Sequence, residues 1–273
     1  MENNVTHRSL TERIKTMIAV DIRRMSRSRL FYIILATSLL VPIVMTVMLT
    51  MMDGQESVNP QTNEITVMEG PDSVWETIGT LPTYGTEEGT AMGDMDVLAM
   101  CNINMAFMGV SVFVCLFISD DFRSGYAKNL FTVRSKKSEY VLSKTVMGVI
   151  CGSLMLILYF VGAMLAGAIT KLSFELVGGL TAVNIVMCLI AKLLLMLVFV
   201  PIFVLISVSA KQKAWLSLCG SLGAGMLLFM MVGMITPLNS TVINVVLCLV
   251  GGAVFSFGLG AFSNLVLRKT SLV

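Results

Sequence analysis

The chain has 273 residues, of which 56% are hydrophobic and only 13% are charged. Soluble domains carry about 25% charged residues, so this composition excludes an ordinary soluble protein and predicts an all-α integral membrane protein. The net charge of +2 says little by itself, because the charges are sorted between segments. It gives no indication of a nucleic-acid partner. The six cysteines lie in apolar runs, which predicts small buried residues and no disulfide framework. The single histidine, His7, excludes a histidine-built metal site.

Residues 9–29 predict an amphipathic helix that lies in the membrane interface. Ser9 and Glu12 have the spacing of a capping box, and apolar residues recur at helical spacing from Leu10 to Met25. The basic residues lie largely off that stripe: Arg13, Arg23, Arg24 and Arg27. Such a helix places its apolar face in the bilayer and its basic face toward anionic lipid. A basic tail that only anchors orientation is the alternative. We expect no cleavable signal peptide, and take the first apolar run as a retained span.

Six apolar runs are each long enough to cross a bilayer as a helix, which needs about 20 residues. They are 30–52, 98–119, 146–169, 183–208, 214–235 and 242–267. With the interfacial helix they form a single transmembrane domain that covers residues 1–273. Small residues one turn apart, such as Gly148 and Gly152, predict close contacts between helices.

The distribution of basic residues predicts the orientation. Of 19 Lys and Arg residues, 17 fall in the N-terminal segment, in the loops 120–144 and 209–213, and in the C-terminal tail. Loops rich in Lys and Arg stay on the cytoplasmic side, so both termini are expected in the cytoplasm and the protein in the cell membrane, as a multi-pass protein. The only exceptions are Lys171 and Lys192.

Residues 53–97 form an acidic outer loop with ten acidic residues and no Lys or Arg. We expect little regular structure there, apart from one short helix around 73–78. The loop is either a negative vestibule for a cationic substrate or a solvated segment kept free of positive charge by the insertion rule. The second interpretation is favoured.

Three polar residues within the apolar runs are candidates for a substrate path or a subunit interface. Asn102 and Asn104 lie near the outer end of the second run, where they face a path or hydrogen-bond across a helix interface. Lys192 lies inside the fourth run, where an ammonium group is expensive unless it is paired or hydrated. It either serves a substrate path or subunit interface, or snorkels to the outer headgroups. The sequence leaves these interpretations open.

The loop 120–144 is expected to be a rigid, exposed knob. Ser119 or Asp120 can cap a short helix that reaches about Leu130, and Ser135 or Ser138 can cap a second helix that continues into the third span. The knob offers charged contacts, aromatic anchors at Phe122, Tyr126 and Phe131, and close backbone approach at Gly125.

Motifs for chemistry within the chain are missing. The sequence has no phosphate-binding loop, no metalloprotease or nucleophile-elbow motif, and no pair of carboxylates within a span. We therefore expect no enzyme activity, no metal site and no cofactor bound by this chain. Without an intramembrane acid or a visible internal repeat, a secondary carrier is disfavoured. A membrane component powered by another protein remains.

The loop 120–144 contains the pattern Asp121-Phe122-Arg123-Ser124-Gly125-x-x-Lys128-Asn129, followed by SEYVLSK at 138–144. This pattern is similar to one that follows the second span in the ABC-2 type permeases, the membrane subunits of a class of ATP-driven exporters. The interfacial helix, the six spans and the large first outer loop also resemble this family. The resemblance implies a dimer with a second permease, the same or a related chain, and two copies of a separate ATP-binding cassette subunit that binds ATP and Mg.

The resemblance also implies roles for the helices. The inner loop would hold a coupling helix that docks on the ATPase, with the elbow helix of residues 9–29 beside it. The docking residues would be Asp120, Asp121, Phe122, Arg123, Gly125, Tyr126, Lys128, Asn129, Phe131 and Arg134. The substrate path would follow methionine-rich faces of spans one, two and five, for a peptide, drug or other amphipathic molecule. The alternative is a stand-alone immunity or sensor module that binds peptides at its outer loop.

Overall fold

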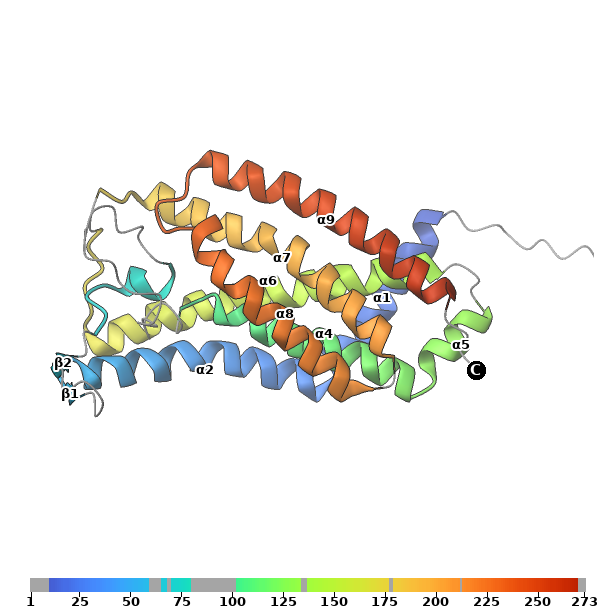
Figure 1. Cartoon of the computed structure of the whole chain (residues 1–273), viewed down its shortest axis with the longest axis horizontal. Coiled ribbons are helices and arrows are strands. Elements are labelled where there is room, and N and C mark those ends of the chain that lie inside the picture. Colours follow the sequence, from blue (N-terminus) through green and yellow to red (C-terminus); the bar gives the residue numbers. More distant parts are fainter. Residues whose placement is uncertain are drawn as a thin grey trace, which may run out of the picture.

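The structure, a computed structural model, describes residues 10–58, 65–67, 70–79, 102–133, 137–176, 179–211 and 213–269. Apart from one short hairpin, the fold in these ranges is all-helical (Figure 1). The long helices are α1 (Leu10–Arg27), α2 (Arg29–Met52), α4 (Met105–Arg123), α6 (Lys137–Thr170), α7 (Ala182–Ala210), α8 (Ala214–Ile235) and α9 (Val242–Lys269). The short elements are β1 (Glu56–Val58), β2 (Ile65–Val67), the 3₁₀ turn Val74–Thr77 and α5 (Tyr126–Val133).

Six of these helices, α2, α4, α6, α7, α8 and α9, are long and apolar enough to cross a membrane. This confirms the predicted all-α architecture with six apolar helices, and it is consistent with a multi-pass membrane protein. The predicted bounds of the fifth span, 214–235, coincide with α8. The predicted bounds of the first, fourth and sixth spans agree with those of α2, α7 and α9 to within one or two residues at each end.

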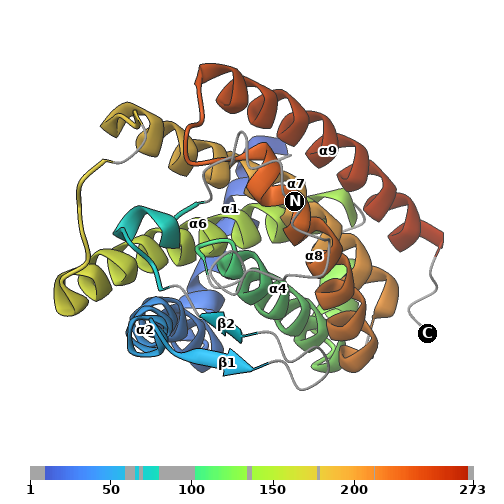
Figure 2. The ribbon, with the colours of Figure 1, turned by 60° about the vertical axis from the view of Figure 1, so that its left-hand side comes forward.

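Helix α4 stands at the centre of the bundle, with α2, α6, α7 and α8 around it (Figure 2). In its most apolar stretch, 67% of the residues are buried, against 22% in α8 and 11% in α9. Aromatic rings fill the contact of α4 with α7, where the ring centroids of Phe107 and Phe199 lie 4.5 Å apart. Helix α9 packs mainly along α7, and α2 along α6.

The connections divide between two ends of the bundle (Figure 1). The acidic end holds the β1–β2 hairpin, the 3₁₀ turn and the turns α6–α7 and α8–α9. The basic end holds α1, α5, the start of α6, the turn α7–α8 and the end of α9. At the acidic end the Val74 amide donates to the carbonyl of Ser173 at 3.1 Å, and the Ile103 amide to that of Thr77 at 2.9 Å. The segment 70–79 is therefore hydrogen-bonded to the rest of the bundle at the 3₁₀ turn.

The acidic segment 53–97 departs from its prediction in one respect. The 3₁₀ turn Val74–Thr77 confirms the short helix expected near 73–78. The antiparallel hairpin of β1 and β2, in which Glu56 pairs with Val67, was not predicted. Most of 53–97 lies outside the described ranges, as does Ser9 of the predicted capping box.

The second predicted span and the loop 120–144 also differ from their predictions. Helix α4 begins at Met105 and continues to Arg123, past the expected end at Ser119. Ser119 and Asp120 lie inside α4, so the prediction that they cap a new helix is wrong. The helix ends instead at Ser124 and Gly125, where Gly125 has a φ of +76° that glycine adopts at little cost. Ser138 lies inside α6, which is one continuous helix from Lys137 into the third span.

The glycine spacing in α6 produces the close contact with α7 that it predicts. A Cβ atom added to Gly148 would lie 2.5 Å from Cγ1 of Val200, and one added to Gly152 would lie 2.8 Å from Sδ of Met196. On the other side of α7, Gly252 approaches Leu197, and the Ser256 hydroxyl of α9 donates to the carbonyl of Leu197 at 2.6 Å. Small residues thus set the spacing of α6, α7 and α9.

We predict that Gly148→Ala destabilises the bundle by about 1–3 kcal/mol, the usual effect of overpacking. The clashing atom belongs to Val200, whose branched side chain has little rotamer freedom. The matched control is Gly223→Ala in α8, where an added Cβ meets nothing within 4 Å. Denaturant titration in detergent measures the difference, and equal stability of the two variants would contradict the prediction.

Candidate functional site

Four charged side chains meet inside the basic end, and we call them the ion-pair cluster: Asp21, Arg24, Asp121 and Lys144. Asp21 and Arg24 come from α1, Asp121 from the last turn of α4, and Lys144 from the third turn of α6. The side chains of both carboxylates are fully buried and that of Lys144 is 1% exposed, while Arg24 is 28% exposed at the edge. The cluster joins three helices and has no net charge.

Lys144 is the central member of the cluster. Its Nζ lies 2.8 Å from Oδ1 of Asp21 and 2.7 Å from Oδ2 of Asp121. The second cation, Arg24, lies on the outer side, with Nη2 at 2.7 Å from Oδ1 of Asp121. Each cation therefore has a carboxylate within ion-pair distance, which buried charges require.

Hydroxyl groups and aromatic rings complete the cluster. The Tyr140 hydroxyl donates to Oδ2 of Asp121 at 3.0 Å, and the Ser143 hydroxyl donates to Oδ2 of Asp21 at 2.6 Å. The ring of Phe117 lies 4.4 Å from the Lys144 ammonium, and the ring of Tyr126 lies 4.0 Å from the Arg24 guanidinium. Because charge-assisted hydrogen bonds and cation–π contacts favour the ionised forms, this shell stabilises the buried charges.

The charges of α1 and α4 also act on Arg24 and Tyr126. Burial acts to lower the pKa of Arg24, but the nearby carboxylates, above all Asp121, outweigh it and raise the pKa above its ordinary value. Burial and the charge of Asp21 raise the pKa of Tyr126, against the opposing effect of Arg24. Both groups keep their ordinary protonation states at neutral pH: a charged guanidinium over a neutral phenol.

The predicted docking residues divide into inward and outward groups. Asp121 and Phe122 are buried, the first in the ion-pair cluster and the second against Tyr140. The prediction that these two lie on an exposed knob is wrong. Helix α4 continues through both residues, and their side chains point into the protein interior. Tyr126 and Phe131 are half-buried on the inner side of α5, and Gly125 makes the turn. The exposed members are Asp120, Arg123, Lys128 and Asn129. Arg134 lies outside the described ranges.

The sequence-based reasoning missed Asp21 and Lys144 as site residues. A signal for Asp21 was present, since the buried face of α1 consists of Met17, Asp21 and Met25 at four-residue spacing. An acid within the apolar stripe of an amphipathic helix needs a buried cation as partner. Lys144 was counted only as a basic loop residue, because the sequence does not show that α6 begins as early as Lys137.

A second buried polar contact lies at the acidic end and contains the three polar residues predicted to lie in the apolar runs, Asn102, Asn104 and Lys192. The Lys192 ammonium is fully buried in α7 and donates to Oδ1 of Asn104 at 2.6 Å and to Oγ1 of Thr236 at 3.1 Å. Oδ1 of Asn102 accepts from the Asn104 amide at 2.9 Å. The interpretation that Lys192 snorkels to the headgroups is therefore wrong, because α7 begins at Ala182 and its neighbours α4 and α8 cover the ammonium. Within the described part of the chain, no carboxylate lies within 4 Å of it.

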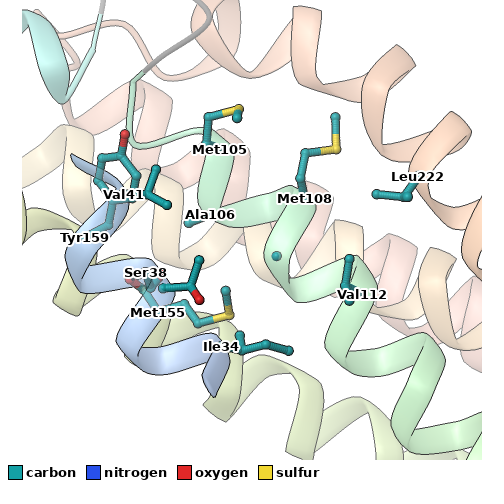
Figure 3. A pocket seen from close by; sticks show the side chains of 12 residues that line it. Ile34, Ser38, Val41, Met105, Ala106, Met108, Val112, Met155, Tyr159 and Leu222 are labelled. Atoms are coloured by element: carbon teal, nitrogen blue, oxygen red, sulfur yellow. Dashed lines mark hydrogen bonds between the residues drawn. The ribbon is translucent and has the colours of Figure 1, made fainter. Parts of the chain in front are cut away.

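An apolar cavity of about 310 Å³ opens between α2, α4, α6 and α8 (Figure 3). Three methionines line it, Met105, Met108 and Met155, and Leu222 closes the α8 side. Two of its hydroxyl groups are occupied within the protein, since Ser38 donates to the Met155 carbonyl and Thr37 to the Ile33 carbonyl. Neither Lys192 nor the two asparagines line this cavity. Its wall offers apolar contact and no charge.

Within the described ranges, no group of three His, Cys, Asp or Glu side chains converges on one point. No family model matches the chain, and neither the curated proteins nor the solved structures yield a match.

We predict that Lys144→Met destabilises the protein by about 3–5 kcal/mol, because removing one partner leaves a buried charge uncompensated. The matched control is Lys128→Met on the exposed face of α5, expected to change stability by less than about 0.5 kcal/mol. Adding Asp21→Asn to Lys144→Met should recover part of the loss, since the orphaned charge is then removed. Denaturant titration of the three proteins in detergent measures this. Equal stability of Lys144→Met and Lys128→Met would refute the buried pairing.

Lys192 gives a contrasting prediction, because its partners are neutral. Lys192→Gln can keep hydrogen bonds to Asn104 and Thr236 without a charge to desolvate, so its unfolding midpoint should equal or exceed that of the wild type. Lys192→Ala loses both bonds and leaves a void, which costs about 2–5 kcal/mol. If the Gln variant is as unstable as the Ala variant, the positive charge itself is required.

Proposed function

We propose that the chain is the membrane-spanning subunit of an ABC-2 type exporter. It would form the substrate path as a permease pair and be driven by a separate ATP-binding subunit, with no ATPase site of its own. The observation that carries the proposal is the ion-pair cluster, which ties α1, α4 and α6 together beside α5. ATP and Mg would be bound by the partner.

The cluster gives α5 a mechanical connection to the spans. Only Ser124 and Gly125 separate α5 from α4. On the inner side of α5, Tyr126 covers Arg24, and the ring of Phe131 lies 5.3 Å from that of Tyr140. A partner that displaces α5 would therefore press on side chains bonded to α4, α6 and α1. This is the arrangement that a coupling helix between spans two and three needs, with α1 as the elbow helix.

The outer face of α5 offers contacts for an ATPase. Lys128 and Asn129 are exposed on α5, and Arg123 is exposed at the end of α4. Asp120 and Arg123 also line a smaller cavity of about 260 Å³ with Ser28 and Ala214, next to the starts of α2 and α8. We propose this polar surface, without Asp121 and Phe122, as the docking surface on the cytoplasmic side.

The apolar cavity favours an export path along α2, α4 and α8, the helices expected to line it. Its wall carries no charge, and methionine side chains adapt to cargo of varied shape. Helices α2 and α8 also leave large apolar side chains uncovered, including Met48, Met51, Leu227 and Met234. We propose that a second permease packs on these faces. The cargo would be an amphipathic molecule such as a peptide or a drug.

The test is co-purification from the native cell in mild detergent. We predict that the wild type elutes with an ATP-binding subunit and that the double variant Arg123→Ala, Lys128→Ala loses it, because two exposed cations are removed without disturbing the ion-pair cluster. The matched control is Lys171→Ala, which removes an exposed cation at the acidic end and should leave the complex intact.

Two outcomes would count against the proposal. Recovery of the wild-type chain alone under several mild conditions would favour the stand-alone immunity or sensor module. Full retention of the ATPase by the double variant, with normal ATP-stimulated export, would show that docking uses another surface.

A further inference from the structure

A further cavity, of about 560 Å³, lies on the far side of the bundle from the proposed path. We call it the α6–α9 groove. It runs between α6 and α9, and α7 forms its floor at Leu197. Figure 2 shows α9 at the periphery of the bundle, beside α7 and away from α2. The volume falls within the range of about 300–1,000 Å³ that is usual for small-molecule sites.

The groove changes in chemistry along its length. Its deep part is apolar, with Val149, Ile150, Leu197 and Phe257 as lining. The one hydroxyl there, that of Ser256, already donates to the Leu197 carbonyl at 2.6 Å. The deep part therefore has no polar group free for a ligand, and it suits a hydrocarbon chain.

The other end of the groove is polar and lies at the basic end. Ser138 and Asn264 line it, and Oδ1 of Asn264 is buried without a hydrogen-bond partner in the part of the chain that the structure describes. Lys137 stands next to Ser138, and its Nζ donates to the Leu267 carbonyl of α9 at 2.8 Å. This ammonium bridges α6 and α9 at the mouth and has two more protons to donate. Arg268 follows Leu267 and is exposed.

The length of the groove corresponds to one leaflet. From Ser138 to Ile150 the α6 wall rises about 18 Å, at about 1.5 Å per residue. The hydrocarbon core of a bilayer is about 30 Å thick, so this distance covers a little more than half of it. Leu197, at the deep end, lies near the middle of α7. A groove that begins at the charged end and closes at mid-depth has the shape of one lipid layer.

We propose that the α6–α9 groove binds one phospholipid with an anionic headgroup. An acyl chain lies between α6 and α9, and the phosphate accepts hydrogen bonds from Lys137 and Arg268. Basic pockets between membrane helices on the cytoplasmic side recognise anionic headgroups in this way. Asn264 faces the headgroup, where a glycerol hydroxyl can donate to its free Oδ1. The proposal requires a membrane but does not depend on the exporter function.

Glycine positions on α9 provide a matched pair of variants. Gly260 lines the groove, and an added Cβ meets nothing within 4 Å; Gly258 has equally open surroundings but does not line the groove. Gly260→Leu therefore fills the groove, while Gly258→Leu adds the same side chain to the same helix outside it. Ala261→Leu is a second filling variant.

The experiment uses the purified full chain, stripped of lipid in detergent, with phosphatidylglycerol or phosphatidylcholine of identical acyl chains added back. Native mass spectrometry counts the bound lipids. We predict one retained phosphatidylglycerol on the wild type and on Gly258→Leu, and binding weaker by at least about ten-fold on Gly260→Leu and Ala261→Leu. Lys137→Gln with Arg268→Gln should remove the preference over phosphatidylcholine, while Lys128→Gln should keep it.

Three results would overturn the proposal. Unchanged lipid retention in both filling variants would place the lipid elsewhere. Equal retention of the two lipids by the wild type would refute the anionic headgroup. A change in oligomeric state in the filling variants, without a change in bound lipid, would show that a second protein chain occupies the groove.

Discussion

The buried ion pairs at the basic end determine how the helices of this protein can be arranged there. Asp21, Asp121 and Lys144 are almost completely removed from water, and such charges are tolerated only when opposite charges meet them. The three residues come from three different helices, so a single arrangement of α1, α4 and α6 satisfies all of them. A slip of one helix by a turn would move its charge by about 5.4 Å and leave the others unpaired. Apolar packing alone tolerates such shifts more easily, and we infer that charge sets the register here.

Helix α4 is fixed at both ends by polar contacts of different kinds. Its last turn carries Asp121 into the ion-pair cluster, and the residue before its first turn, Asn104, accepts from Lys192. The first contact joins α4 to α1 and α6, and the second joins it to α7 and, through Thr236, to the end of α8. Between these points α4 makes mainly apolar contacts. A displacement of α5 would therefore push on the last turn of α4, while the start of α4 is held by Lys192. Helix α4 would then tilt more readily than it would slide.

The sequence predicts well what depends on neighbours along the chain and poorly what depends on distant partners. Six apolar runs appear as six helices, and Gly148 and Gly152 make their expected close contact, because hydrophobic length and small-residue spacing are local properties. The end of α4 was misplaced because the residues beyond Ser119 look polar and exposed in sequence. Asp121 is buried only because Arg24 and Lys144 reach it from elsewhere. The hydrogen bond that holds Lys192 inside the bundle is made to Asn104, 88 positions away. The sequence does not show this contact, and so it does not exclude snorkelling.

The exposed faces of α8 and α9 differ in the types of their apolar side chains, and this difference indicates different surroundings. In the most apolar stretch of each helix, most residues are not buried. On α8 that surface includes four methionines, Met226, Met230, Met231 and Met234, whereas α9 contains none and exposes valine, leucine and phenylalanine. Unbranched methionine side chains adapt to irregular surfaces, such as a cargo or another protein. Branched and aromatic side chains suit lipid tails, where no specific fit is needed. Since α8 borders the apolar cavity and α9 borders the groove, we infer that the second permease and the cargo proposed above would lie on the α2–α8 side, and that lipid would cover the α9 side.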